Sequence, residues 1–369
     1  SLCTINIVYA RSGFSEPLVA CLIMLAVLAI FNYLKNNSLS ALIASGSCIG
    51  YTIFIKKNSI ILLPAFLVFL FYIILKNRKG LVPRLLHAAV FLLPIAISAL
   101  AIVLQNRILY GGLSNTEFGT IGDMLGKVRT DSFPIKGLYY YLISSGKGIL
   151  IYNIAMGMGF FAIKNFLKKY RVMGVFLLAL MLSNLAFYSF IFTRGSIFSW
   201  GPRYLFPVLP LMTVFLAEFI SKGNAAMRKA AVLSFALLGF MIQLPGLIMN
   251  FSRYIFFVKE KLLLPEYLMD FMPELSPIKG MWALFVSMLN RGMRGESLSF
   301  LYNPDFLFVA SAKASLSGYD YPDIWWVNII RACPAMGPYV LIGAMIIVLA
   351  IALSRKSINS SIRKQRADD

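Results

Sequence analysis

The sequence predicts an all-α polytopic membrane protein, and three observations lead to that prediction. Hydrophobic residues make up 59% of the 369 residues, and the mean hydropathy is +0.77. Only 14% of the residues are charged, far below the roughly 25% of a soluble domain. The apolar residues also form runs long enough to cross a hydrocarbon layer of roughly 30 Å. A soluble protein is therefore excluded, and we attribute the net charge of +20 to membrane topology rather than to a nucleic-acid partner.

Nine apolar segments are expected to span the bilayer as helices. They cover about residues 17–34, 39–55, 58–75, 85–104, 149–163, 172–192, 205–220, 230–250 and 337–354. Only a KKN turn separates the second from the third, which suits a tight helical hairpin. The second also contains GSCIG, a GxxxG pattern that predicts close helix packing. The first ten residues are apolar but too short to cross, so we expect them to end a helix that begins before this sequence.

The distribution of lysine and arginine predicts the orientation. With residues 1–16 outside, the short inner segments carry 17 of these residues and the short outer segments only five. The positive-inside rule favours this arrangement. The other 13 lysines and arginines lie in two long outer connections, which influence orientation less because long loops translocate largely regardless of charge. The predicted organisation is a transmembrane module at 1–250 with an outer loop at 105–148, an extracytoplasmic region at 251–336, a last span at 337–354 and a basic cytoplasmic tail at 355–369. An apolar patch at 280–289 is compatible with a helix lying on the bilayer.

Residues 194–210, RGSIFSWGPRYLFPVLP, join two apolar segments at the outer surface and form the main candidate site. Gly201 and Pro202 should end regular structure there, so that Arg203 and Tyr204 open the next helix. Arg194 and Arg203 can hold phosphate oxygens, and Trp200 and Tyr204 can stack on a sugar or a lipid. The alternative is an interfacial anchor, since these residue types are common at membrane boundaries. Two arginines on the outer side favour a functional role.

Two further basic positions and one acid are candidates on the same side. Lys56 and Lys57 either snorkel to the interface or bind a lipid phosphate. Lys147, in SSGKG, is a plausible phosphate contact, although the stretch lacks the spacing of a nucleotide-binding P-loop. Glu16 either caps a helix or serves as an acid, a base or a metal ligand.

Other titratable residues give weaker signals. His87 and Glu218 lie near the inner ends of spans, and we interpret both as structural. The four scattered cysteines and the single histidine predict no disulfide and no zinc site.

Four motifs together resemble a family. ARSGFSEPLVA at the outer start of a span, the lysine pair, SSGKGI and SWGPRYLFPVLP are similar to bacterial and archaeal membrane glycosyltransferases of the GT-C superfamily. The closer likeness is to the group of protein O-mannosyltransferases and aminoarabinose transferases, of the family 39 type. It covers roughly residues 10–220, with a weaker echo in YPDIWW.

The resemblance implies a sugar transfer from a polyprenyl-phosphate donor to a glycan, lipid or protein acceptor, by direct inverting displacement at the outer face of a plasma or inner membrane. It makes Glu16 a secondary acidic position with a catalytic role, and places Lys56 or Lys57 near the donor phosphate. It assigns Arg203 and Tyr204 to a later outer loop. The family's principal acid lies ahead of every residue present here, so this stretch alone is expected to lack a catalytic part. Some relatives use a divalent metal, but the sequence offers no ligand cluster for one.

The main alternative is a flippase or another transporter of lipid-linked glycans without transferase activity. A transporter should carry ionisable residues at mid-membrane, whereas here the charges gather at the outer ends of apolar segments. We therefore expect Glu16, Lys56 or Lys57, Arg203 and Tyr204 to converge at one outward-facing cavity.

Overall fold

The computed structural model of the chain describes residues 3–10, 15–76, 80–112, 115–116, 119–120, 134–190, 199–221 and 225–295. Its contacts divide the chain into two compact units, Ser1–Leu247 with Phe251–Leu284, and Ile248–Asn250 with Phe285–Asp369. The packing and the site discussed below belong to the first unit. Arg194, the span expected at 337–354 and the tail at 355–369 lie outside the described residues.

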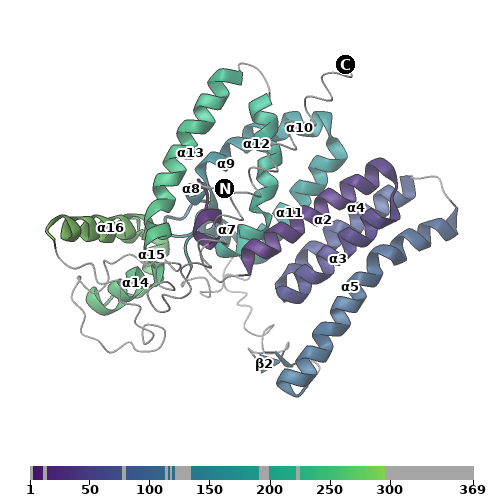
Figure 1. Cartoon of the computed structure of the whole chain (residues 1–369), viewed down its shortest axis with the longest axis horizontal. Helices are drawn as coiled ribbons and strands as arrows, with labels where there is room; N and C mark the ends of the chain where they lie inside the picture. Colours follow the sequence, from purple (N-terminus) through teal and green to yellow (C-terminus); the bar gives the residue numbers. More distant parts are fainter. Residues whose placement is uncertain are drawn as a thin grey trace, which may run out of the picture. The chain divides into compact units, whose positions relative to one another are not determined.

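The described part is helical apart from one short β ladder, which confirms the all-α class (Figure 1). Strands β1 (Asn115–Thr116) and β2 (Gly119–Thr120) pair antiparallel, with Asn115 opposite Thr120. The helices are α1 (Asn6–Ala10), α2 (Glu16–Asn36), α3 (Leu39–Ile55), η1 (Lys57–Leu62), α4 (Leu63–Lys76), α5 (Leu81–Tyr110), α7 (Pro134–Ile143), α8 (Ile149–Tyr152), α9 (Ile154–Gly157), η2 (Met158–Ala162), α10 (Ile163–Lys169), α11 (Arg171–Phe190), η4 (Arg203–Leu211), α12 (Met212–Ser221), α13 (Ala225–Ile248), α14 (Phe251–Phe256), η5 (Phe257–Lys261), α15 (Leu268–Phe271), η6 (Pro273–Leu275) and α16 (Pro277–Met293).

Six of the described helical stretches are long and apolar enough to cross a membrane. They are Glu16–Asn36, Lys57–Lys76, Leu81–Tyr110, Arg171–Phe190, Arg203–Ser221 and Ala226–Ile248, and α3 is a shorter apolar helix between the first two. Their outer faces expose large apolar side chains, such as Leu28, Val68 and Ile97. Such extended apolar surface suits contact with lipid, so the chain is an integral membrane protein. The count of nine spans stays a prediction.

The segment expected as one span at 149–163 is instead broken into α8, α9 and η2. The break lies at Asn153, whose φ of −136° and ψ of 45° leave the helical region. Its side chain accepts a hydrogen bond from the backbone N–H of Ile5 (3.2 Å) and donates one to the carbonyl of Ile149 (3.2 Å). A contact with a remote part of the chain therefore interrupts a segment that hydropathy alone treats as continuous.

Helix α3 packs against both α2 and α5, and the GxxxG pattern explains its close approach to α5 (Figure 1). A Cβ at Gly46 would overlap the carbonyl oxygen of Phe91, and one at Gly50 would lie 2.9 Å from the carbonyl oxygen of Pro94. Only glycine lets these backbones meet, so the structural role predicted for the pattern is confirmed. On the opposite side, the Ser45 hydroxyl donates to the carbonyl of Ala26 on α2 (3.0 Å).

Gly46→Ala is therefore expected to destabilise the protein, because a Cβ with no room against backbone forces α3 and α5 apart. Overpacking of this kind costs roughly 1–3 kcal/mol. The matched control is Gly157→Ala, whose Cβ would meet only Leu150 Cδ2, at 3.7 Å. Thermal unfolding in mild detergent should show a lower apparent Tm for the first variant and an unchanged or higher one for the second. Equal values would contradict the packing argument.

Candidate functional site

The candidate site is centred on Glu16, the first residue of α2. Its carboxylate is fully buried, and Oε1 accepts hydrogen bonds from Lys56 Nζ (2.8 Å) and Arg203 Nε (2.6 Å). Lys56 is 14% exposed and Arg203 27%. The three residues are 40 and 187 positions apart in sequence, so the tertiary fold alone brings them together. We call them the charged triad.

The two adjacent lysines point to different partners. Lys56 is the single residue between α3 and η1, and its extended backbone (φ −137°, ψ 93°) turns its side chain to Glu16. Lys57 begins η1 and donates to Asn106 Oδ1 near the end of α5 (2.8 Å), with its Nζ 5.9 Å from the centroid of the Tyr110 ring. Of the pair, Lys56 therefore belongs to the charged triad and Lys57 does not.

Arg203 opens η4, as the sequence predicts, and residues 199–202 lead into it. We call these four residues the strap. Gly201 has a φ of 61°, which favours glycine, and a Cβ there would lie 2.8 Å from the Tyr152 ring. The N–H of Arg203 donates back to the carbonyl of Gly201 (3.0 Å), and Pro202 follows the turn without a donor of its own. The strap thus has one conformation that aims Arg203 at Glu16.

Tyr204 completes the site from the next position. Its ring stacks on Tyr188 of α11, with centroids 4.8 Å apart and planes 9° from parallel. Lys56 Nζ lies 5.3 Å from the centroid of the Tyr204 ring, within the range of a cation–π contact. Tyr140 and Tyr141 of α7 are buried in the same aromatic cluster. One wall of the site is therefore aromatic and rigid.

In the triad, two cations share one carboxylate. Burial lowers the pKa of Lys56, and the Glu16 carboxylate opposes that shift. Glu16 Oε2 is also buried and has no hydrogen-bond partner among the described residues. A buried acceptor without a partner costs free energy, so this oxygen is a polar group that the fold leaves unsatisfied. The site as a whole can hold an anion beside a hydrogen-bond donor.

Lys147 differs from its sequence expectation. It is fully buried, and its Nζ donates to the carbonyl of Ser199, the first residue of the strap. The same Nζ lies 5.3 Å from the centroid of the Phe251 ring. Burial lowers the pKa of Lys147 to about 8, and the Asp270 carboxylate opposes that shift. In this structure Lys147 anchors the strap rather than offering an exposed ammonium to phosphate.

Trp200 also differs from its expected role as a stacking surface. It is 3% exposed, and its indole N–H donates to Gln243 Oε1 (2.7 Å). Tyr9 donates its hydroxyl hydrogen to the carbonyl of Trp200 (3.0 Å), and the Tyr152 ring packs edge-on against the indole. These contacts make Trp200 a core residue that fixes the strap.

Sequence reasoning missed the contacts that support the SSGKG turn. Asp270 of α15 accepts a hydrogen bond from the Tyr140 hydroxyl (3.2 Å), and its backbone carbonyl accepts from the N–H of Gly146 (3.3 Å). A Cβ at Gly146 would lie 2.5 Å from the Cα of Asp270, so the turn and α15 meet backbone to backbone. Burial raises the pKa of Asp270, while Lys147 and Tyr140 favour its ionised form. No local pattern around Asp270 signals this role.

Metal ligands and the remaining titratable residues add little to the site. Within the residues that the structure describes, no group of three or more His, Cys, Asp and Glu side chains is placed to hold a metal ion. His87 is buried and shares a hydrogen bond with the Tyr33 hydroxyl (2.5 Å), which suits the structural role expected of it.

Comparison with known proteins does not assign the chain to a family. No family model matches the sequence, and neither the curated proteins nor the solved structures contain a significant match. The class of the protein therefore rests on its fold, an integral membrane protein of apolar helices, and any activity is argued from the charged triad.

Proposed function

We propose that this protein is a membrane glycosyltransferase that moves a sugar from a polyprenyl-phosphate donor to an acceptor at one face of the bilayer. The observation that carries the proposal is the charged triad, in which Lys56 and Arg203 meet on one oxygen of a buried carboxylate. Two cations that meet on one carboxylate at the ends of apolar helices suit a ligand with a phosphate head and a hydrocarbon tail. The orientation predicted by the lysine and arginine distribution would put this face outside the cell.

The triad supplies the groups that the transfer needs. An acceptor hydroxyl or amine attacks the anomeric carbon, and the bond from that carbon to the phosphate oxygen breaks. The leaving phosphate takes the electron pair and gains negative charge, which Arg203 and Lys56 stabilise. The acceptor loses its proton to Glu16 Oε2, which accepts no hydrogen bond from either cation and which is buried in this structure, so the side chains that cover it must move aside when the acceptor binds.

Arg203 and Lys56 have different positions in the site and would contact a bound donor differently. Arg203 binds Glu16 through Nε and is the most exposed of the three, so its guanidinium plane reaches toward a ligand. Lys56 lies between Glu16 and the Tyr204 ring, and that ring, held by Tyr188, offers a flat face beside the cations. A donor sugar bound there would have its phosphate at the cations and its ring against Tyr204.

The test is Arg203→Lys in the complete gene product. A guanidinium holds two phosphate oxygens in fixed geometry, whereas an ammonium is a compact point charge, so transfer should fall tenfold or more. The matched control is Arg171→Lys, an exposed arginine that begins α11 at the opposite end of the helices, which should leave transfer unchanged. The assay measures sugar transfer from a polyprenyl-phosphate donor, with the amount of protein in the membrane as a second readout.

Near-normal transfer by Arg203→Lys would leave Arg203 as an interfacial anchor, since either side chain can snorkel. Movement of a labelled lipid-linked sugar across vesicles, with no transferred product, would instead support the transporter alternative.

A further inference from the structure

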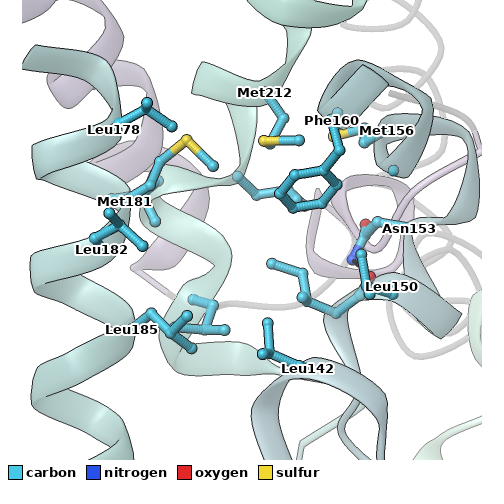
Figure 2. A pocket seen from close by; sticks show the side chains of 15 residues that line it. Leu142, Leu150, Asn153, Met156, Phe160, Leu178, Met181, Leu182, Leu185 and Met212 are labelled. Atoms are coloured by element: carbon cyan, nitrogen blue, oxygen red, sulfur yellow. Dashed lines mark hydrogen bonds between the residues drawn. The ribbon is translucent and has the colours of Figure 1, made fainter. Parts of the chain in front are cut away.

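An apolar cavity lies apart from the charged triad, between α11 and the broken segment that follows the SSGKG turn. It encloses about 250 Å³, and Figure 2 shows Leu142, Leu150, Met181 and Met212 pointing into it. Among the described residues that line it, Asn153 has the only polar side chain, and its amide is hydrogen-bonded to the backbone of Ile5 and of Ile149. Nothing in the lining therefore calls for a polar ligand.

The size of the cavity is unusual for a folded interior. Packed proteins leave few voids larger than a water molecule, because empty space forfeits dispersion contacts. Apolar cavities of roughly 150 Å³ stay dry and take up small apolar molecules. The larger cavity here is thus expected to hold hydrocarbon rather than water.

The cavity is partly open, and exposed side chains in its lining indicate where. Two of its lining residues are among the exposed apolar side chains, Leu182 at 58% and Phe160 at 45%. Leu182 lies between the ends of α11, which is long and apolar enough to cross the membrane, so the opening faces the lipid chains. Met156, Met181 and Met212 give the lining flexible side chains that adapt to an irregular occupant.

We propose that this cavity binds an acyl chain of a phospholipid from the surrounding bilayer, which enters beside Leu182. None of the lining residues in the described part of the chain is charged, so none of them selects a head group. The occupant is then set by abundance, and bilayer phospholipid far exceeds any specialised lipid. The chain lies against Leu205, Val208 and Leu209 of η4, and so supports the helix that Arg203 opens.

The experiment uses the full chain in vesicles of phosphatidylcholine, doped with a phosphatidylcholine that carries a photoreactive diazirine near one chain end. Mass spectrometry should place cross-links on lining residues such as Met181 and Leu150. Gly157→Leu should reduce the cross-links severalfold, because residue 157 lines the cavity and a leucine there fills part of it. The backbone of Gly157 is helical and its Cβ would make only a van der Waals contact, so the fold should accept the change. Leu182→Trp, a change at an exposed position, should also reduce the cross-links by blocking the opening. Val68→Leu on the exposed face of α4 is the control and should change nothing.

Two results would overturn the assignment. Cross-linking of the lining that is no stronger than that of exposed faces, or that both cavity variants leave unchanged, would mean that no chain enters. Displacement of the label by a few per cent of polyprenyl phosphate would mean that the site selects the carrier lipid instead. Both readouts are independent of sugar transfer, so they stand or fall separately from the proposed function.

Discussion

Glu16→Gln is expected to destabilise the protein more than any other single change at the site. The substitution keeps the shape of the side chain but removes the charge that pairs with both Lys56 and Arg203. Removing one partner of a buried ion pair typically costs roughly 3–5 kcal/mol, because the remaining charge stays desolvated. Here the two cations keep 14% and 27% exposure, so we expect the lower end of that range. The measurement is the apparent Tm in mild detergent, which should fall by several degrees.

A double-mutant cycle with Lys56→Met checks that the effect comes from the pair. If Glu16 and Lys56 are coupled, the double variant should lose clearly less stability than the two single variants do together. Glu218→Gln on α12 is the matched control, since it changes another buried carboxylate, which lies toward the other end of the stretch Arg203–Ser221 from Arg203. Strict additivity in the cycle would mean that the contact between Glu16 and Lys56 contributes nothing.

The second large effect is a pH dependence of the free energy of unfolding, which Lys147 produces and which Lys147→Met removes. Burial brings the pKa of Lys147 down from 10.5 to about 8 in the folded protein. Between these two pH values the unfolded chain binds more protons than the folded one, so the free energy of unfolding rises with pH. Burying the charged ammonium costs about 3 kcal/mol below pH 8, and this cost disappears as the pH approaches 10.5.

The measurement compares the apparent Tm of the wild type and of Lys147→Met at pH values from 7 to 10.5. The wild type should gain stability relative to the variant across the upper part of this range, because methionine has no proton to lose. Asp270 contributes with the opposite sign, since burial raises its pKa and its contribution to stability is lost as the pH rises through the folded value. The carboxylate is present in both proteins, but its pKa should be higher in the variant, which lacks the ammonium that favours the ionised form. Parallel pH curves would show that Lys147 is not buried as a cation.

Much of the fold follows from hydropathy, because a span must be long and apolar wherever it lies in the chain. That requirement locates α2, α5, α11 and α13 from the sequence alone. It fails at 149–163, where Asn153 takes a non-helical conformation to bond with Ile5, a residue 148 positions away. Average hydropathy contains no information on such a contact.

The site could be predicted in part. Charges at helix ends are visible in the sequence, and they indicated that Glu16, a lysine of the pair and Arg203 would lie together. The choice of Lys56 over Lys57 depends on the backbone of one residue between two helices, which no pattern specifies. Lys147 and Trp200 were expected to be accessible because they lie in connections between apolar segments. Both are buried, and their burial depends on residues remote in sequence, such as Gln243 for Trp200, which no local pattern reveals.

The contacts of residues 3–10 also constrain how the chain can be made. The backbone of Ile5 bonds to a residue 148 positions later, and the hydroxyl of Tyr9 to one 191 positions later. At a synthesis rate of about 5–20 residues per second, the second partner appears on the order of 10–40 s after the tyrosine. Contacts between such distant residues form late, because the intervening chain must first be ordered. During that interval the Tyr9 hydroxyl has no Trp200 carbonyl to bond, so the strap gains this contact only when the early segment and residue 200 come together.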